Sequence, residues 1–191
     1  MKFSIVLIIF LCSNTIIGQN FHTEFEYEIS NNNHIKIQNS YPKGGQKFIT
    51  TGFIITDRKE CVYVTFWTCI SNETTSNLEL EIDFSTDSFI IPSSPNINFN
   101  LYIPNDKMSL EKETLPNYGL DINNFLEKNI NKPSKLRTII EPNNSHLFYT
   151  VVITNKGVNG TVRAGFELQR EELIYKINNH EINCGKIIIK K

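Results

Sequence analysis

The chain has 191 residues, of which 19 are basic and 20 acidic, for a net charge of −1 with histidine neutral. This balance lacks the basic stripe of a nucleic-acid-binding protein and the positive charge that draws proteins to anionic membranes. We therefore expect neither a nucleic-acid partner nor electrostatic attachment to a membrane.

Residues 1–18 have the pattern of a cleavable signal peptide. Lys2 supplies a positive charge, an apolar run follows from Phe3 to Cys12, and polar residues then lead to Gly18. These are the n-region, the h-region and the exit of an export signal. We expect cleavage after Gly18, so the mature protein is secreted or periplasmic.

A membrane anchor and a lipoprotein are the alternatives for this N-terminal segment. A membrane anchor needs about 20 mostly apolar residues, roughly twice the length of the run found here. Lipid attachment at Cys12 would need a small residue before it, and Leu11 stands there. The prediction is therefore one domain, residues 19–191, without a membrane span after cleavage.

After residue 19, most of the chain alternates apolar and polar residues, as β-strands do. The segment 78–85 places Leu, Ile and Phe on one side and Glu and Asp on the other, which is typical of a strand with one face in solvent. The segment 61–70 is apolar on both sides, which predicts a central strand covered on both faces. The other extended segments are expected at 21–29, 34–38, 48–56, 89–92, 96–103, 136–141, 146–154, 161–170, 173–178 and 187–189. A turn is expected at 41–45.

The alternation stops in a long connection over residues 105–132. One helix is expected there, at 121–130, with Asp121 as its N-cap and Pro133 as its stop. Many short antiparallel strands indicate an all-β, immunoglobulin-like sandwich with Greek-key connections, and a β-barrel is the alternative. The short helix is expected to cover an open end of the sandwich or to cross between the sheets.

Cys61, Cys69 and Cys184 remain once Cys12 is removed with the signal peptide. Cys61 and Cys69 lie in one expected strand, roughly 26 Å apart at ~3.3 Å per residue. A disulfide needs Cα atoms within about 7 Å, so these two do not pair with each other. We expect Cys184 to lie near Cys69 or Cys61, as a bridge or a close thiol pair.

No catalytic or metal-binding motif is present in the sequence. The four histidines stand far apart and form no HExxH motif, and the cysteines form no Cys-x-x-Cys pair. The closely spaced acidic residues alternate along expected strands, as an outward face does. The sequence therefore predicts no catalytic residues, no metal, no cofactor and no enzymatic activity.

One pair of aromatic residues could bind a ligand. Tyr63 and Trp67 share one face of the strand 61–70, with their rings about 13 Å apart along it. If both were exposed, they would form a stacking platform for two sugar units. If both were buried, they would be core residues.

Several short segments resemble a group of small secreted or periplasmic proteins of Bacteroidota, whose activity is not known. The signal exit Ile17–Asn20 resembles those of exported proteins of that phylum. The segments Val64–Thr68, Leu78–Phe84, Asn117–Leu120 and Leu147–Tyr149 are similar to the group. The resemblance implies export in a Gram-negative bacterium and a β-sandwich, and it implies no functional residues.

Together these features predict a non-enzymatic exported protein that acts in binding or in envelope structure. Its expected partner is an unknown protein or glycan of the cell envelope. The alternatives are a carbohydrate-binding module and an envelope-associated hydrolase.

Overall fold

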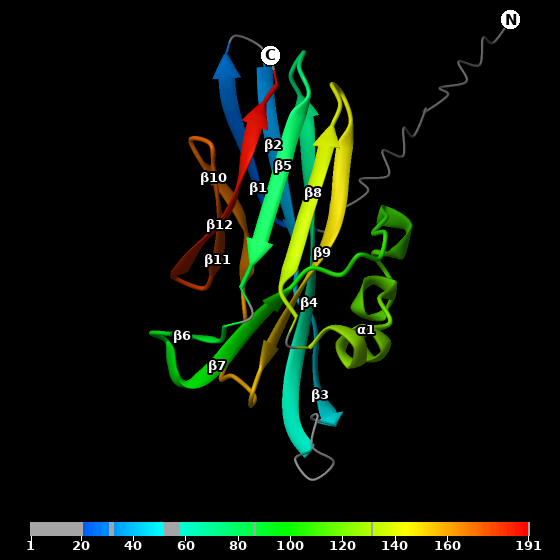
Figure 1. The fold of residues 1–191 in the computed structure, drawn as a ribbon, viewed down its shortest axis with the longest axis vertical. Helices are drawn as coiled ribbons and strands as arrows, with labels where there is room; N and C mark the ends of the chain where they lie inside the picture. The colour runs from blue at the N-terminus through cyan, green and yellow to red at the C-terminus, as the bar shows by residue number, and fades with distance from the viewer. Residues whose placement is uncertain (1–20, 31–32, 52–57, 86, 131, 191) are drawn as a thin grey trace, which may run out of the picture.

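The computed structural model describes residues 21–30, 33–51, 58–85, 87–130 and 132–190, so the expected signal peptide lies outside the described part. The described chain forms two antiparallel β-sheets packed together, with a layer of short helices on the outer side of one sheet (Figure 1). This confirms the predicted all-β sandwich with one short α-helix. The strands belong to two separate sheets, so the fold is a sandwich and not the alternative barrel. The narrower immunoglobulin-like assignment stays a prediction.

The larger sheet has seven strands in the order β1-β2-β4-β9-β7-β6, and β3 also pairs with β4. Its strands are β1 Phe21–Ser30, β2 Asn33–Ser40, β3 Lys43–Thr51, β4 Arg58–Glu73, β6 Phe89–Ile91, β7 Ser94–Tyr102 and β9 Ser145–Thr154. The smaller sheet has five strands in the order β10-β11-β12-β5-β8. These are β5 Leu78–Phe84, β8 Ser134–Ile140, β10 Ala164–Gln169, β11 Glu172–Ile177 and β12 His180–Ile189.

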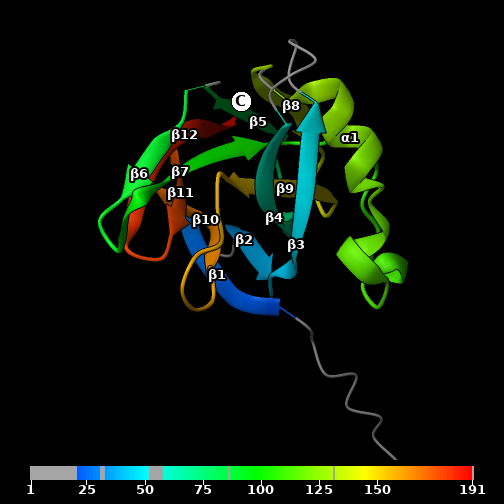
Figure 2. The ribbon, with the colours of Figure 1, turned by 90° about the horizontal axis from the view of Figure 1, so that it is seen from below.

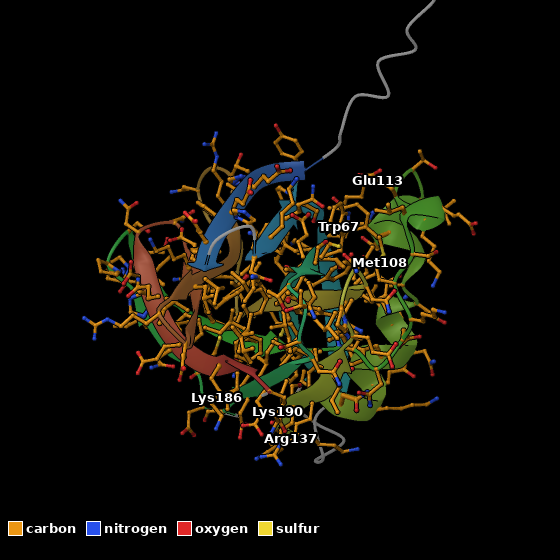
Figure 3. All side chains as sticks on the ribbon, turned by 90° about the horizontal axis from the view of Figure 1, so that it is seen from above. Trp67, Met108, Glu113, Arg137, Lys186 and Lys190 are labelled. Atoms are coloured by element: carbon orange, nitrogen blue, oxygen red, sulfur yellow. The ribbon has the colours of Figure 1, made fainter. Side chains whose placement is uncertain are left out.

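The core between the sheets follows the alternation of the sequence. In β5 the four apolar side chains are buried in this core, as predicted, because a strand turns alternate residues to opposite faces. Its acidic residues face outward and form ion pairs with neighbouring strands: Glu79 with Lys190, Glu81 with Arg137 and Lys186, and Asp83 with Lys135. Figure 3 shows Arg137, Lys186 and Lys190 together on this outer face.

Strand β4 is the longest, with 16 residues, and it has different neighbours along its two halves. Residues 58–65 pair with β3, and residues 68–73 pair with β2. Between these two partners the backbone N–H of Trp67 donates to Ser40 Oγ at 2.8 Å. The turn expected at 41–45 is shorter than predicted, because β3 already begins at Lys43 and takes a bulge after Gly44.

The connection after β7 packs on the outer face of the larger sheet. It contains two 3₁₀ turns, Leu110–Lys112 and Pro116–Gly119, and the helix α1, Ile122–Asn129. A second apolar core forms between this layer and β4, β7 and β9. The expectation that the helix covers an open end or crosses between the sheets is therefore wrong, because β4 and β9 are apolar on both faces and need a cover on the second one.

Helix α1 begins as the sequence predicts. The Asp121 side chain accepts a hydrogen bond from the backbone N–H of Asn124 at 3.2 Å, which satisfies one of the unpaired donors of the first turn. Ile122, Phe125 and Leu126 are buried against the sheet. With eight residues this helix is far shorter than a membrane span, and none of the described helices has the length and apolarity to cross a membrane.

Candidate functional site

The two aromatic residues considered for sugar stacking are buried. Tyr63 is 3% exposed and Trp67 is 2% exposed, because the connection after β7 lies over them. Figure 3 shows Trp67 and Met108 inside the molecule, between the sheet and that connection. The hypothesis of an exposed Tyr63–Trp67 platform is therefore wrong, and both residues are core residues.

The expectation that Cys184 lies near Cys69 or Cys61, as a bridge or a close thiol pair, is also wrong. Cys61, Cys69 and Cys184 are all present as thiols. Cys184 lies in the core between the sheets, whereas Cys69 and Cys61 belong to the core on the other side of the larger sheet. Burial raises the pKa of the Cys184 thiol to about 12, and its Sγ donates to the carbonyl of Leu173 at 3.3 Å.

A groove opens where the edge strands of the two sheets come together. Strand β1 ends the larger sheet and β10 ends the smaller one, and the two lie beside each other (Figures 1 and 2). The groove has a volume of about 290 Å³. It is lined by residues from both sheets and the adjacent turns: His22, Thr23, Phe25, Asn39, Arg163, Ala164, Gly165, Glu167, Lys176, Asn178 and Asn179.

The floor of the groove is fixed by the side chain of Asn39, which is 1% exposed. Its Nδ2 donates to Thr23 Oγ1 at 3.1 Å and to the carbonyl of Phe166 at 3.0 Å. Its Oδ1 accepts from the backbone N–H of Phe166 at 2.9 Å and from Thr68 Oγ1 at 2.9 Å. Both donors and both acceptor positions of the amide are therefore used. Asn39 pairs with β10 as a neighbouring strand would, and so joins the two sheets at the groove.

Gly165 makes room for this amide. A Cβ atom at Gly165 would lie 2.6 Å from Cγ of Asn39, closer than nonbonded carbon atoms approach. Because Asn39 is held by four hydrogen bonds, it has no easy way to move aside. The close approach of β2 to β10 at the groove therefore requires glycine at this position.

Arg163 stands at the rim, just before β10, and Asn178 holds its backbone. The N–H of Asn178 donates to the carbonyl of Arg163 at 2.7 Å, and the N–H of Arg163 donates to Asn178 Oδ1 at 3.1 Å. Asn178 has a φ of 51°, a left-handed conformation that asparagine tolerates better than most residues. This arrangement extends the β10–β11 ladder by one residue pair and fixes the position of the Arg163 backbone, from which its side chain extends.

The charges around the groove are unevenly paired. Lys176 Nζ lies 2.8 Å from a Glu167 oxygen and 3.0 Å from a Glu181 oxygen, so one ammonium group is shared between two carboxylates. In the part of the chain that the structure describes, Arg163 and His22 take part in none of the ion pairs. Burial and, to a lesser degree, the nearby positive charge of Arg163 lower the pKa of His22. Arg163 thus gives the groove a positive charge that none of the described carboxylates pairs with.

Sequence reasoning did not find this site. It treated His22 as one of several scattered histidines and gave no role to Arg163, Asn178 or Asn39. Nothing in the local pattern marks these residues, because polar residues on strand faces and in turns are common on any sandwich. They become a site only through the packing of β1 against β10, whose first residues are more than a hundred positions apart.

Among the described residues, no three His, Cys, Asp or Glu side chains gather in a group able to hold a metal ion. Protein-family models, curated proteins and solved structures were compared with the chain, and none of them matches it.

Proposed function

We propose that this chain is an exported, non-enzymatic binding protein that holds its ligand in the groove between β1 and β10. The groove itself carries the proposal, because it combines a rigid floor with the charge of Arg163, which no carboxylate in the described part of the chain pairs with. Preformed pockets with a few well-placed polar groups are the usual form of ligand sites. Export is supported by the residue pattern of 1–18, which is that of a signal peptide. The partner is then a molecule of the periplasm or the cell exterior, a protein or a glycan of the envelope of a Gram-negative bacterium of the Bacteroidota.

A binding role suits the groove better than a catalytic one. Glu167, the carboxylate that lines it, is ion-paired with Lys176 at 2.8 Å. Glycoside hydrolysis in its usual form needs two carboxylates on opposite sides of the scissile bond, one of them with a raised pKa. The amide of Asn39 is fully used in joining the sheets and so serves to shape the site.

The binding role can be tested with two matched variants. Arg163→Gln removes the charge at the groove, and Arg137→Gln makes the same change on the outer face of β8, where Arg137 is 77% exposed. Immobilised wild-type protein and both variants are incubated with a detergent-free envelope extract, and the retained compounds are identified by mass spectrometry. We expect a compound that wild type and Arg137→Gln retain and Arg163→Gln loses. Equal retention by all three proteins would contradict the proposed site.

Export has a separate test. The full chain is expressed in a Bacteroidota host, the cells are fractionated, and the mature N-terminus is sequenced. We expect the protein outside the cytoplasm, beginning within one or two residues of Gln19. A protein that stays in the cytoplasm with Met1 intact would refute export.

A further inference from the structure

The chemistry of the groove narrows the class of ligand, starting from its charge. Arg163 and His22 both line it, and the charge of Arg163 acts on the His22 imidazole. Glu167, which follows Arg163 along β10, is paired with Lys176, so the charged residues that line the groove sum to +1. An arginine guanidinium presents parallel donors that match a carboxylate, and such pairs are among the stronger hydrogen bonds in proteins. The unbalanced charge therefore favours an anionic ligand.

The size of the groove limits the ligand to a small molecule. A volume of about 290 Å³ is just below the range found for ligand pockets, roughly 300–1,000 Å³. One monosaccharide or a molecule of similar size fits such a space. A polymer could place only one of its units there.

The remaining walls favour a ligand that carries hydroxyl groups. Asn178 and Asn179 supply side-chain amides, Thr23 supplies a hydroxyl, and Phe25 supplies an aromatic ring. Amides and hydroxyls can both donate to and accept from a sugar hydroxyl. An amino acid fits less well, because its ammonium group would need a carboxylate, and Glu167 is already paired with Lys176.

We propose that the groove binds a monomeric sugar acid, with its carboxylate between the Arg163 guanidinium and the His22 imidazole and its hydroxyl groups toward Asn178, Asn179 and Thr23. This inference rests on the proposed binding function and specifies the ligand class for that same site.

The same geometry predicts that binding takes up a proton. The charged residues that line the groove with His22 are Arg163, Glu167 and Lys176, and Lys176 also pairs with Glu181. The ring centroid of Tyr41 lies 5.8 Å from that of His22. Burial and Arg163 lower the pKa of His22, so its imidazole is neutral in the empty groove at neutral pH. A bound carboxylate favours the protonated imidazole, because opposite charges stabilise each other. Affinity should therefore rise as the pH falls from 7.5 to 5.5.

The test compares two sugars that differ only at the charged group, D-glucuronate and D-glucose. Each is titrated into the purified protein and followed by amide chemical shifts at pH 7.5 and 5.5. We expect glucuronate to shift the amides of Gly165 and Asn178, and to bind at least roughly 10-fold more tightly than glucose. Arg163→Gln should weaken glucuronate binding by roughly 10- to 100-fold, as expected when a hydrogen-bonded charge is removed. Arg137→Gln should bind as wild type does, and His22→Gln should bind with little dependence on pH.

Thermal unfolding of each variant checks that the fold is retained, which we expect because Arg163 is exposed. Equal affinity for glucose and glucuronate, or tighter binding of inorganic phosphate than of glucuronate, would overturn the sugar-acid inference. So would glucuronate binding that does not depend on Arg163. If glucuronate and galacturonate both fail to bind while an envelope compound is retained through Arg163, the ligand class is wrong and the proposed function stands. If that retention also fails, the proposed function falls with it.

Discussion

The side-chain amide of Asn39 in β2 pairs with both backbone groups of Phe166 in β10, at 3.0 Å and 2.9 Å. Phe166 lies on the edge strand of the smaller sheet, where backbone N–H and C=O groups have no neighbouring strand. Such edges can pair with other chains unless something covers them. Asn39, which belongs to the larger sheet, occupies these backbone groups of β10. It thereby joins the edges of the two sheets and forms the floor of the groove.

Replacing Asn39 with alanine should strongly destabilise the protein. The change leaves the N–H and C=O of Phe166 and the hydroxyl of Thr68 without their partner, and each buried unpaired group costs about 1–3 kcal/mol. We expect Asn39→Ala to lower the free energy of unfolding by about 3 kcal/mol or more, measured by urea denaturation. Asn96→Ala, at an exposed position of β7, should change it by less than about 0.5 kcal/mol. A similar small effect for both variants would show that Asn39 does not hold the sheets together.

Gly165 and Asn39 should be energetically coupled. Gly165→Ala adds a methyl group 2.6 Å from Asn39 Cγ, and overpacking of this kind costs about 1–3 kcal/mol. In the Asn39→Ala background the contacts with Cγ and Nδ2 are gone and the contact with Cβ at 2.9 Å remains, so the same change should cost less than it does in wild type. The measurement is a double-mutant cycle in urea. Additive effects would indicate that the two residues do not contact each other.

Lys43 should stabilise the connection that covers the larger sheet. Its Nζ donates to the carbonyls of Glu113 and Leu115, the latter at 2.9 Å, and lies 4.2 Å from the centre of the Tyr118 ring. Lys43→Met removes both hydrogen bonds and should lower the free energy of unfolding by about 1–2 kcal/mol. Amide exchange should increase over residues 110–119 in particular. Lys156→Met, at an exposed loop position, is the control and should leave that exchange unchanged.

His146 should make stability depend on pH. Burial lowers the pKa of His146 in the folded state below the usual 6.5. The imidazole of His146 therefore binds a proton more readily in the unfolded chain than in the folded one. As the pH drops below about 6.5, the free energy of unfolding falls, and above about 6.5 this contribution to stability is fully present. We expect the loss between pH 7 and pH 5 to be smaller in His146→Gln than in wild type. His22→Gln should act in the same direction, because the pKa of His22 is also lowered, and an unchanged loss in the double variant would refute the idea.

The three thiols should differ in reactivity. Cys184 is 4% exposed and its thiol has a pKa of about 12, so at pH 8 it carries almost no reactive thiolate. We expect iodoacetamide to modify the partly exposed Cys61 before Cys69 and Cys184 in the folded protein. In urea without reductant all three should react, as peptide mass mapping can show. Failure of Cys184 to react in urea would indicate a disulfide after all.

Much of the strand pattern can be predicted from local sequence, because a strand sends alternate side chains to opposite faces whatever it packs against. This is why the segment 78–85 correctly predicted the buried and exposed residues of β5. It is also why the segment 61–70, apolar on both sides, correctly predicted a central strand. The start of α1 depends on a hydrogen bond between the Asp121 side chain and the backbone N–H of Asn124, three residues later. Because this bond is local, the start of the helix was also predictable from sequence.

The functional features could not be predicted in this way, because they depend on which surfaces meet. The same apolar face that holds Tyr63 and Trp67 would be a binding platform if open, and it is a core because residues 108–126 fold over it. Cys184 and Cys69 are both buried, yet a sheet separates them. His22 and Arg163 form one side of a groove only because the edges of two sheets pack together through Asn39. Local alternation determines which way each side chain points, and long-range packing determines what it meets.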